Sequence, residues 1–163
     1  MSSIVHFPEQ FKIVVGTPYV TTGAGDITCD YVSLKHINMA WIVCHFLQAA
    51  GDATVVNPYR ATAAATPAGG VAIAHNAPHW LNANIATNDT LVRGADGTTA
   101  TLDATLGAHQ LLIFQIDPAQ LGDTYDCMSL VISNSGEATN FVCVEYYLET
   151  RYGQATPPAA ITD

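Results

Sequence analysis

Short apolar segments, rather than long amphipathic ones, account for most of the bulky side chains in this 163-residue sequence. The segments are rich in β-branched and aromatic residues and are bounded by Gly, Pro, Asn or Asp, which is typical of β-strands. No segment carries a sustained 3.6-residue period, so long helices are not expected. The sequence predicts an all-β sandwich or barrel of about eight strands, at residues 11–16, 40–48, 53–59, 71–75, 99–103, 109–116, 125–133 and 139–150.

Alternating side chains along the last two predicted strands indicate one core face and one polar face. Apolar residues alternate with Cys127 and Ser129 along 125–133, and 139–150 alternates in the same way. The SNSGEA segment between them contains a glycine where a positive φ is expected, so we predict a hairpin. The LLIFQI run is apolar on both faces, as expected of a central strand or of one under a subunit interface.

The chain length fits one domain with one core. We place this β-sandwich domain at 1–153 and expect 154–163 (QATPPAAITD), with two prolines and no periodicity, to be an extended C-terminal arm. Residues 61–70 and 82–108 have the composition of long loops. In DPAQL, Pro118 occupies a favourable first helical position and predicts a single helical turn.

The charge balance argues against binding to nucleic acid, and the short apolar runs argue against a membrane span. Fourteen acidic residues oppose five basic ones, giving a formal charge of −9, and no basic cluster provides a phosphate-binding footprint. No apolar run approaches the roughly 18 residues of a membrane helix. The N-terminal residues lack the pattern of a secretory signal, so we expect synthesis and retention in a cytosol.

The four cysteines have the spacing of structural thiols. Cys29, Cys44, Cys127 and Cys143 form no CxxC pair, and three of them lie within apolar strand-like segments. We therefore expect reduced, structural thiols.

Metal and catalytic motifs are weak, and we predict no metal, cofactor or catalytic residues. His75 and His79 are four apart, but Pro78 and a preceding strand-like segment argue against the helix that would aim both at one metal, so a solvated loop anchored by Trp80 is favoured. Asp89, Asp96 and Asp103 lack the alternate-residue spacing of a calcium loop. No GxSxG segment is present, and the cysteines lack the local signature of cysteine hydrolases.

Three aspartates between two apolar runs, Asp117, Asp123 and Asp126, could mark an acid/base site or a connection between strands. Asp117 precedes Pro118 and is placed to cap a short helical turn, while Asp123 follows a glycine in a second turn. These positions favour a connection over catalysis.

Three segments together resemble a group of small tailed-bacteriophage virion proteins encoded among the head genes. They are DYVSLKHINMAWIVCHF, LLIFQIDPAQLGDTYDCMSLVIS and FVCVEYYLETRYGQATPPAAITD, within about 30–50 and 106–163. The shared features are an entry strand of the form D-Y/W-V/I-S-L-K-N/H followed by an apolar strand, a short turn of the form I-x-A/P-x-x-L, and a closing L-x-x-R-Y before a proline-containing tail. His36 and Cys44 depart from the usual pattern, which more often has Asn and another apolar residue at these positions.

The resemblance implies a head decoration, or cement, protein. Such a protein would be a jelly-roll-like β-sandwich on the outer surface of the virion capsid, assembled in the bacterial host cytoplasm, with the major capsid protein as its partner. It would act as a homotrimer through multivalent binding and would not be an enzyme. A trimer also agrees with apolar strands such as LLIFQI and FVCVEYYL, which exceed what one small sandwich needs to bury.

Five residues in the resembling segments are candidates for the trimer or capsid interface. A basic side chain in so acidic a chain is a candidate for a specific ion pair, and Arg and Tyr are enriched at interface hot spots. The candidates are Tyr31, Leu34, Lys35, Arg151 and Tyr152.

Two alternative functions remain open. Trp41, Trp80 and Tyr59, with the Asn-rich segment HNAPHWLNANIATND, could form the platform of a carbohydrate-binding jelly roll on a phage spike or bacterial protein. A cupin-like metalloenzyme is less favoured, because the chain has no His-x-His pair.

Overall fold

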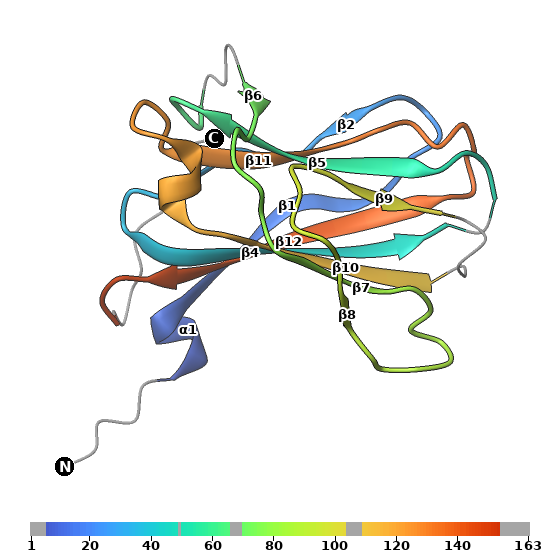
Figure 1. Cartoon of the computed structure of the whole chain (residues 1–163), viewed down its shortest axis with the longest axis horizontal. Coiled ribbons are helices and arrows are strands. Elements are labelled where there is room, and N and C mark those ends of the chain that lie inside the picture. Colours follow the sequence, from blue (N-terminus) through green and yellow to red (C-terminus); the bar gives the residue numbers. More distant parts are fainter. Residues whose placement is uncertain (1–5, 49, 66–69, 104–108, 154–163) are drawn as a thin grey trace.

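Two antiparallel sheets pack face to face in a computed structural model, which describes residues 6–48, 50–65, 70–103 and 109–153 (Figure 1). The first sheet, sheet A, has six strands in the order β1 (Phe11–Thr21), β12 (Phe141–Thr150), β4 (Ile37–Leu47), β10 (His109–Ile116), β7 (His79–Asn82) and β8 (Val92–Arg93). Sheet B has β2 (Ile27–Thr28), β11 (Cys127–Ile132), β5 (Thr54–Ala61) and β6 (Val71–Ala72), with β3 (Val32–Ser33) paired to β11 and β9 (Ala100–Leu102) paired to β5.

The strand order is that of a jelly roll. If β2 and β3 count as one strand, the principal strands are β1, β2/β3, β4, β5, β6, β10, β11 and β12. Sheet A then contains the first, eighth, third and sixth of them in spatial order, and sheet B the second, seventh, fourth and fifth. Two interlocked Greek keys produce this order. The all-β sandwich expected from the sequence is therefore confirmed.

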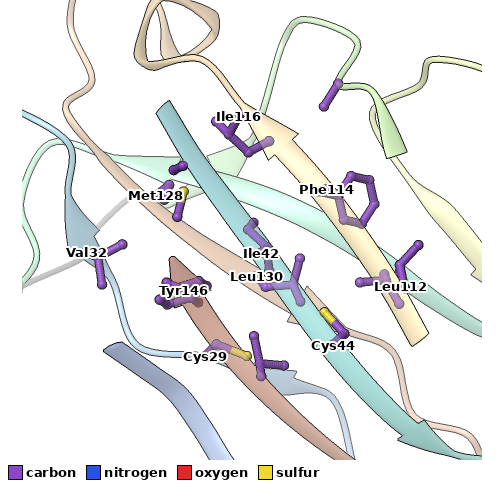
Figure 2. Close-up of a cluster of buried hydrophobic side chains, with 14 of the residues drawn as sticks. Cys29, Val32, Ile42, Cys44, Leu112, Phe114, Ile116, Met128, Leu130 and Tyr146 are labelled. Atoms are coloured by element: carbon purple, nitrogen blue, oxygen red, sulfur yellow. The ribbon is translucent and has the colours of Figure 1, made fainter. Parts of the chain in front are cut away.

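The core lies between the sheets and follows the predicted alternation. Along β12, Val142, Val144, Tyr146 and Leu148 are fully buried, and each intervening residue is only half-buried. Figure 2 shows Tyr146 among apolar side chains from both sheets, including Ile42 of β4. Burial of such side chains is the main favourable term for a fold of this size.

Two predictions about the C-terminal strands are wrong. The segment between β11 and β12 is not a hairpin loop, because β11 lies in sheet B and β12 in sheet A, so the connection crosses between the layers. Its Gly136 does have the expected positive φ of 73°. The second face of β11 is not polar and exposed either: Cys127 and Ser129 are both buried, and Cys127 packs in a small cluster with Tyr31 and Ala61.

Four short strands were not predicted: β2, β3, β7 and β8. Three of them have only two residues, too short for any alternation to be read. The segment around Trp80, which was expected to be a loop, is the strand β7, and it pairs with β10. On its other side β7 pairs with β8, which lies within the predicted loop 82–108 and forms the edge of sheet A. Parts of the predicted loops (66–69 and 104–108) and the predicted arm 154–163 lie outside the described residues.

A short helix, α1 (Phe7–Gln10), precedes β1 and lies on the side of sheet A that faces away from sheet B (Figure 1). Pro8 is in its first turn, and a capping box joins His6 and Glu9, with the His6 backbone N–H donating to Glu9 Oε2 at 3.2 Å. Within the described ranges, no helix is long and apolar enough to cross a membrane.

All four cysteines are free thiols, as predicted. Burial raises the pKa of Cys29 to about 12 and that of Cys44 well above its usual value. Burial, together with the hydrogen bond to Asp126, raises the pKa of Cys127 to about 12. These thiols therefore stay protonated at neutral pH.

Candidate functional site

The outer face of sheet A is apolar where a solvated sheet face is usually polar. Residues opposite one another in an antiparallel pair share a face. Pairing across the sheet links Ile13, Tyr147 and Trp41 in one row. The next row runs from Val15 through Glu145, Val43 and Ile113 to Trp80. We call the apolar members of the two rows the outer apolar face: Ile13, Val15, Trp41, Val43, Trp80, Ile113 and Tyr147.

The outer apolar face is accessible in the single chain. Ile13 is 47% exposed and Val15 is 49% exposed, although both lie in the body of a strand. Exposed apolar side chains that are scattered singly are ordinary, but a contiguous patch usually marks an interaction site. This face is therefore the strongest candidate functional surface of the described chain.

A shallow groove of about 360 Å³ lies on this face beside α1. The Phe7 ring stacks on Phe11 with centroids 4.6 Å apart and lies 6.3 Å from Tyr147, and Phe11 lies 5.8 Å from Trp41. We call it the aromatic groove, and it is lined by Phe7, Phe11, Trp41, Val43, Ile113 and Tyr147.

Reciprocal hydrogen bonds hold α1 against the end of β12. The Gln10 side-chain amide donates to the Thr150 carbonyl, and the Thr150 hydroxyl donates to the Gln10 carbonyl, both at 3.1 Å. These two hydrogen bonds fix where β1 begins and keep Phe7 over the sheet. The Phe7 side chain is nevertheless half exposed. The sequence reasoning missed the groove because α1 was not predicted; Pro8 followed by Glu9, typical of a helix N-terminus, was the available signal.

The predicted interface residues divide between the core and one corner of the surface. Tyr31 and Leu34 are buried, at 7% and 2% exposure, and pack within hydrophobic clusters instead of facing solvent. Lys35, Arg151 and Tyr152 are exposed. Their two segments meet, because the Arg151 backbone N–H donates to the His36 carbonyl at 3.0 Å. Whether this corner contacts a partner stays a prediction.

Lys35 is held by an internal ion pair. Its Nζ lies 2.9 Å from Asp126 Oδ2, and this hydrogen bond and charge raise the pKa of the lysine. Burial alone would raise the pKa of Asp126, but bonds from the Cys127 thiol and from Lys35 bring it below its usual value. The lysine is therefore already engaged within the chain.

The predicted turn roles of the other two aspartates are confirmed. Asp117 caps the 3-10 helix η2 (Pro118–Leu121), with the Ala119 N–H donating to its Oδ1 at 2.9 Å. Asp123 lies in the following turn, which is closed by the Tyr125 N–H donating to the Gly122 carbonyl at 3.1 Å. Both carboxylates border a groove of about 570 Å³ that Arg151 also lines. Asp117 and Asp123 therefore belong to the connection between β10 and β11, and Asp126 forms the ion pair with Lys35.

The possible metal ligands do not converge in the described part of the chain, where no group of three or more His, Cys, Asp or Glu side chains could hold an ion. His75 is exposed, whereas His79 lies in β7 with its ring 5.4 Å from that of Phe114. Asp96 pairs with Arg93 at 2.8 Å.

The proposed carbohydrate platform is split between the two sheets. Trp41 and Trp80 share the outer face of sheet A, but Tyr59 belongs to β5 of sheet B. The Arg93 guanidinium lies 5.9 Å from the Trp80 ring centre. The three aromatic residues therefore do not form one surface.

Comparisons with known proteins give only structural likeness. No protein-family model matches the chain, and no curated protein matches it. Among solved structures, the SPBc2 prophage-derived protein YomS has a TM-score of 0.49 at 11% identity, over 91% of this chain and 96% of that one. A structure of infectious bursal disease virus strain Gt has a TM-score of 0.24 at 13% identity, over 88% of this chain and 38% of that one. The D431N mutant VP2 protein of that virus, in T=1 particles, has a TM-score of 0.25 at 11% identity, over 91% of this chain and 44% of that one.

Proposed function

We propose that this protein is a non-enzymatic structural component of a bacteriophage virion that binds the outside of the capsid lattice as a homotrimer and stabilises it. Two independent observations support the proposal. One is the resemblance of about 30–50 and 106–163 to phage head proteins. The other, which carries most weight, is the outer apolar face of sheet A with its aromatic groove.

The outer apolar face favours an assembly role because the fold itself does not need it. The inner faces of the two sheets already provide a dry core of fully buried side chains, such as Phe114 and Tyr146. The apolar side chains on the far side of sheet A add no burial to that core. Contact with another protein would remove them from water at roughly 25 cal/mol per Å². A homotrimer uses the same patch three times and makes each weak capsid contact multivalent.

The capsid contact is assigned to the corner formed by Lys35, Arg151 and Tyr152. Arg151 is exposed, and its Nε makes a long bond, 3.4 Å, to the Ile37 carbonyl. Tyr152 is 77% exposed. A guanidinium beside an exposed phenol is well suited to an acidic or hydrogen-bonding patch on the major capsid protein.

Two measurements test the proposal. Light scattering of the purified protein should give about three times the 17.3 kDa chain mass; a monomer at micromolar concentration would count against the homotrimer. Particles of the phage that encodes the chain, purified on a density gradient, should contain it as an abundant component. Its absence from such particles would contradict the virion assignment.

The substitution Arg151→Ala tests the proposed capsid corner. We expect lower occupancy on undecorated particles of that phage, measured by quantitative electrophoresis, with an unchanged circular dichroism spectrum. Asp52→Ala is the control, because Asp52 is also exposed but lies between β4 and β5, at the opposite end of β4 from Ile37 and the corner. Equal occupancy for wild type, variant and control would show that the corner does not contact the capsid.

A further inference from the structure

We propose that the aromatic groove of each copy receives the C-terminal segment 154–163 of a neighbouring copy. The inference rests on the proposed homotrimer and goes beyond it by naming both the receiving surface and the segment that fills it. Three features of the molecule support it: the aromatic lining of the groove, the position of the last described residues, and the low charge of the segment.

The groove and the segment are chemically matched. Four of the six groove residues are aromatic: Phe7, Phe11, Trp41 and Tyr147. The segment reads QATPPAAITD, with adjacent Pro157 and Pro158 followed by small and apolar residues. Aromatic-lined grooves are a recurrent receptor for proline-containing segments, because proline rings pack on aromatic faces and the stiff backbone loses little entropy on binding. The groove lining contains no charged side chain that could form an ion pair with a charged ligand.

The described chain ends close to α1, the helix that carries Phe7 of the groove. The Thr150 hydroxyl also donates to the Tyr152 carbonyl, at 2.9 Å, so the bonds of Thr150 place the last described residues next to Gln10 of α1. Gln10 directly precedes Phe11, which lines the groove. Ten further residues span about 31 Å at about 3.1 Å per residue in an extended proline-type helix. That length is enough to leave one domain at this rim and cross the equivalent groove of a neighbour packed beside it.

Charge favours this segment over the folded surface of a second copy. Each copy carries a formal charge of −9, so bringing two domain faces together opposes many carboxylates. Residues 154–162 carry no charged side chain, and Asp163 is the only one in the segment. Glu145 lies within the second row of the outer apolar face, between Val15 and Val43, where an uncharged stretch of chain can approach it without repulsion.

The contact is heterologous, because the donated segment and the receiving groove are different surfaces. Contacts of this type close into a ring when the rotation between copies permits it, and otherwise extend into filaments. A threefold ring in which each copy donates one segment and receives one fills all three grooves. Every copy then makes the same two contacts, one with its segment and one with its groove. An acidic chain can form a closed trimer in this way.

Phe7→Ala tests the groove, and Tyr19→Ala is its matched control. Both rings are at least half exposed, at 50% and 63%, and each stacks on a second ring, at 4.6 Å on Phe11 and 4.8 Å on Phe141. Only Phe7 lines the groove. In analytical ultracentrifugation, we expect Phe7→Ala to raise the midpoint concentration of trimer dissociation about 30-fold, as for an interface hot spot. Tyr19→Ala should change it about twofold or less. Equal effects of the two variants would overturn the assignment.

Disulfide trapping in the full-length chain identifies the donor. The pair Val43→Cys and Ala160→Cys, made in a Cys143→Ser background, joins the groove to the segment. Non-reducing electrophoresis should show covalent dimers and trimers. The control pair Val55→Cys and Ala160→Cys uses an exposed position on sheet B and should remain monomeric.

The outcomes separate this inference from the proposed function. Crosslinks confined within one chain would place the segment in its own groove and overturn the exchange. Equal trapping by the two pairs, in a protein that light scattering shows to be trimeric, would overturn the groove as receptor and leave the homotrimer intact. A monomeric unmodified protein would overturn both.

Discussion

Two buried hydroxyl groups support the irregular segment between β2 and β3. The Tyr146 hydroxyl donates to the Asp30 carbonyl at 3.1 Å, and the Ser129 hydroxyl donates to the Cys29 carbonyl at 2.6 Å. Buried carbonyls that lack a strand partner are costly unless they are hydrogen-bonded. Tyr146 and Ser129 are fully buried. These two hydroxyl groups therefore stabilise the irregular backbone between β2 and β3.

Thiol reactivity should follow burial. Alkylation requires the thiolate, and raised pKa values keep Cys29, Cys44 and Cys127 protonated at neutral pH. Only Cys143 is partly exposed. With iodoacetamide at neutral pH, mass spectrometry should find Cys143 alkylated first and the other three only in guanidinium chloride. Rising pH should speed the reaction, since more thiolate forms as pH approaches each raised pKa. Uniform labelling of the native protein would contradict the buried core.

At the scale of elements, Arg60 of β5 holds η2 in place. Its Nη1 donates to the Leu121 carbonyl at 2.7 Å, and its guanidinium lies 4.3 Å from the centre of the Tyr125 ring. Leu121 is fully buried and ends the helical turn. Arg60 thereby links the connection from sheet A to sheet B with β5, the strand that pairs with β11.

Arg60→Met should loosen this connection. The variant keeps the apolar stem but loses a charge-assisted hydrogen bond and a cation–π contact, which together should lower the free energy of unfolding by about 1–3 kcal/mol. Arg93→Met is the control; its exposed ion pair with Asp96 should be worth about 0–1 kcal/mol. Urea unfolding measures both. A loss for Arg60→Met no larger than for the control would show that the connection does not depend on the guanidinium.

Local chemistry made some elements predictable and left others hidden. Period-two alternation identified the buried face of β12, and proline with a capping aspartate identified η2, because both signals lie within a few residues. Which sheet a strand joins depends on contacts far apart in sequence, so β11 and β12 were wrongly read as a hairpin. The aromatic groove was hidden for a similar reason: Trp41 and Ile113 come from distant segments that meet through strand pairing, and Phe7 joins them from α1, which was not predicted.

For the whole molecule, the two sheets use their apolar surface differently. The inner faces make one core, and the outer face of sheet A carries an apolar surface that we propose contacts other chains. The acidic charge of −9 on each copy opposes that contact, because like charges repel when chains assemble. Assembly is therefore a balance between apolar burial, which salt leaves largely unchanged, and repulsion, which salt screens.

This balance predicts that trimers tighten as ionic strength rises. The Debye length falls from about 30 Å at 0.01 M salt to about 3 Å at 1 M, so repulsion between copies is nearly removed while burial of residues such as Trp41 and Phe7 persists. Sedimentation velocity in increasing sodium chloride should show the dissociation midpoint moving to lower protein concentration. An interface built on ion pairs, for example through Arg151 or Lys35, would respond in the opposite direction, because screening weakens exposed pairs. Trimers that dissociate in high salt would therefore move the subunit contact from the outer apolar face to the charged corner.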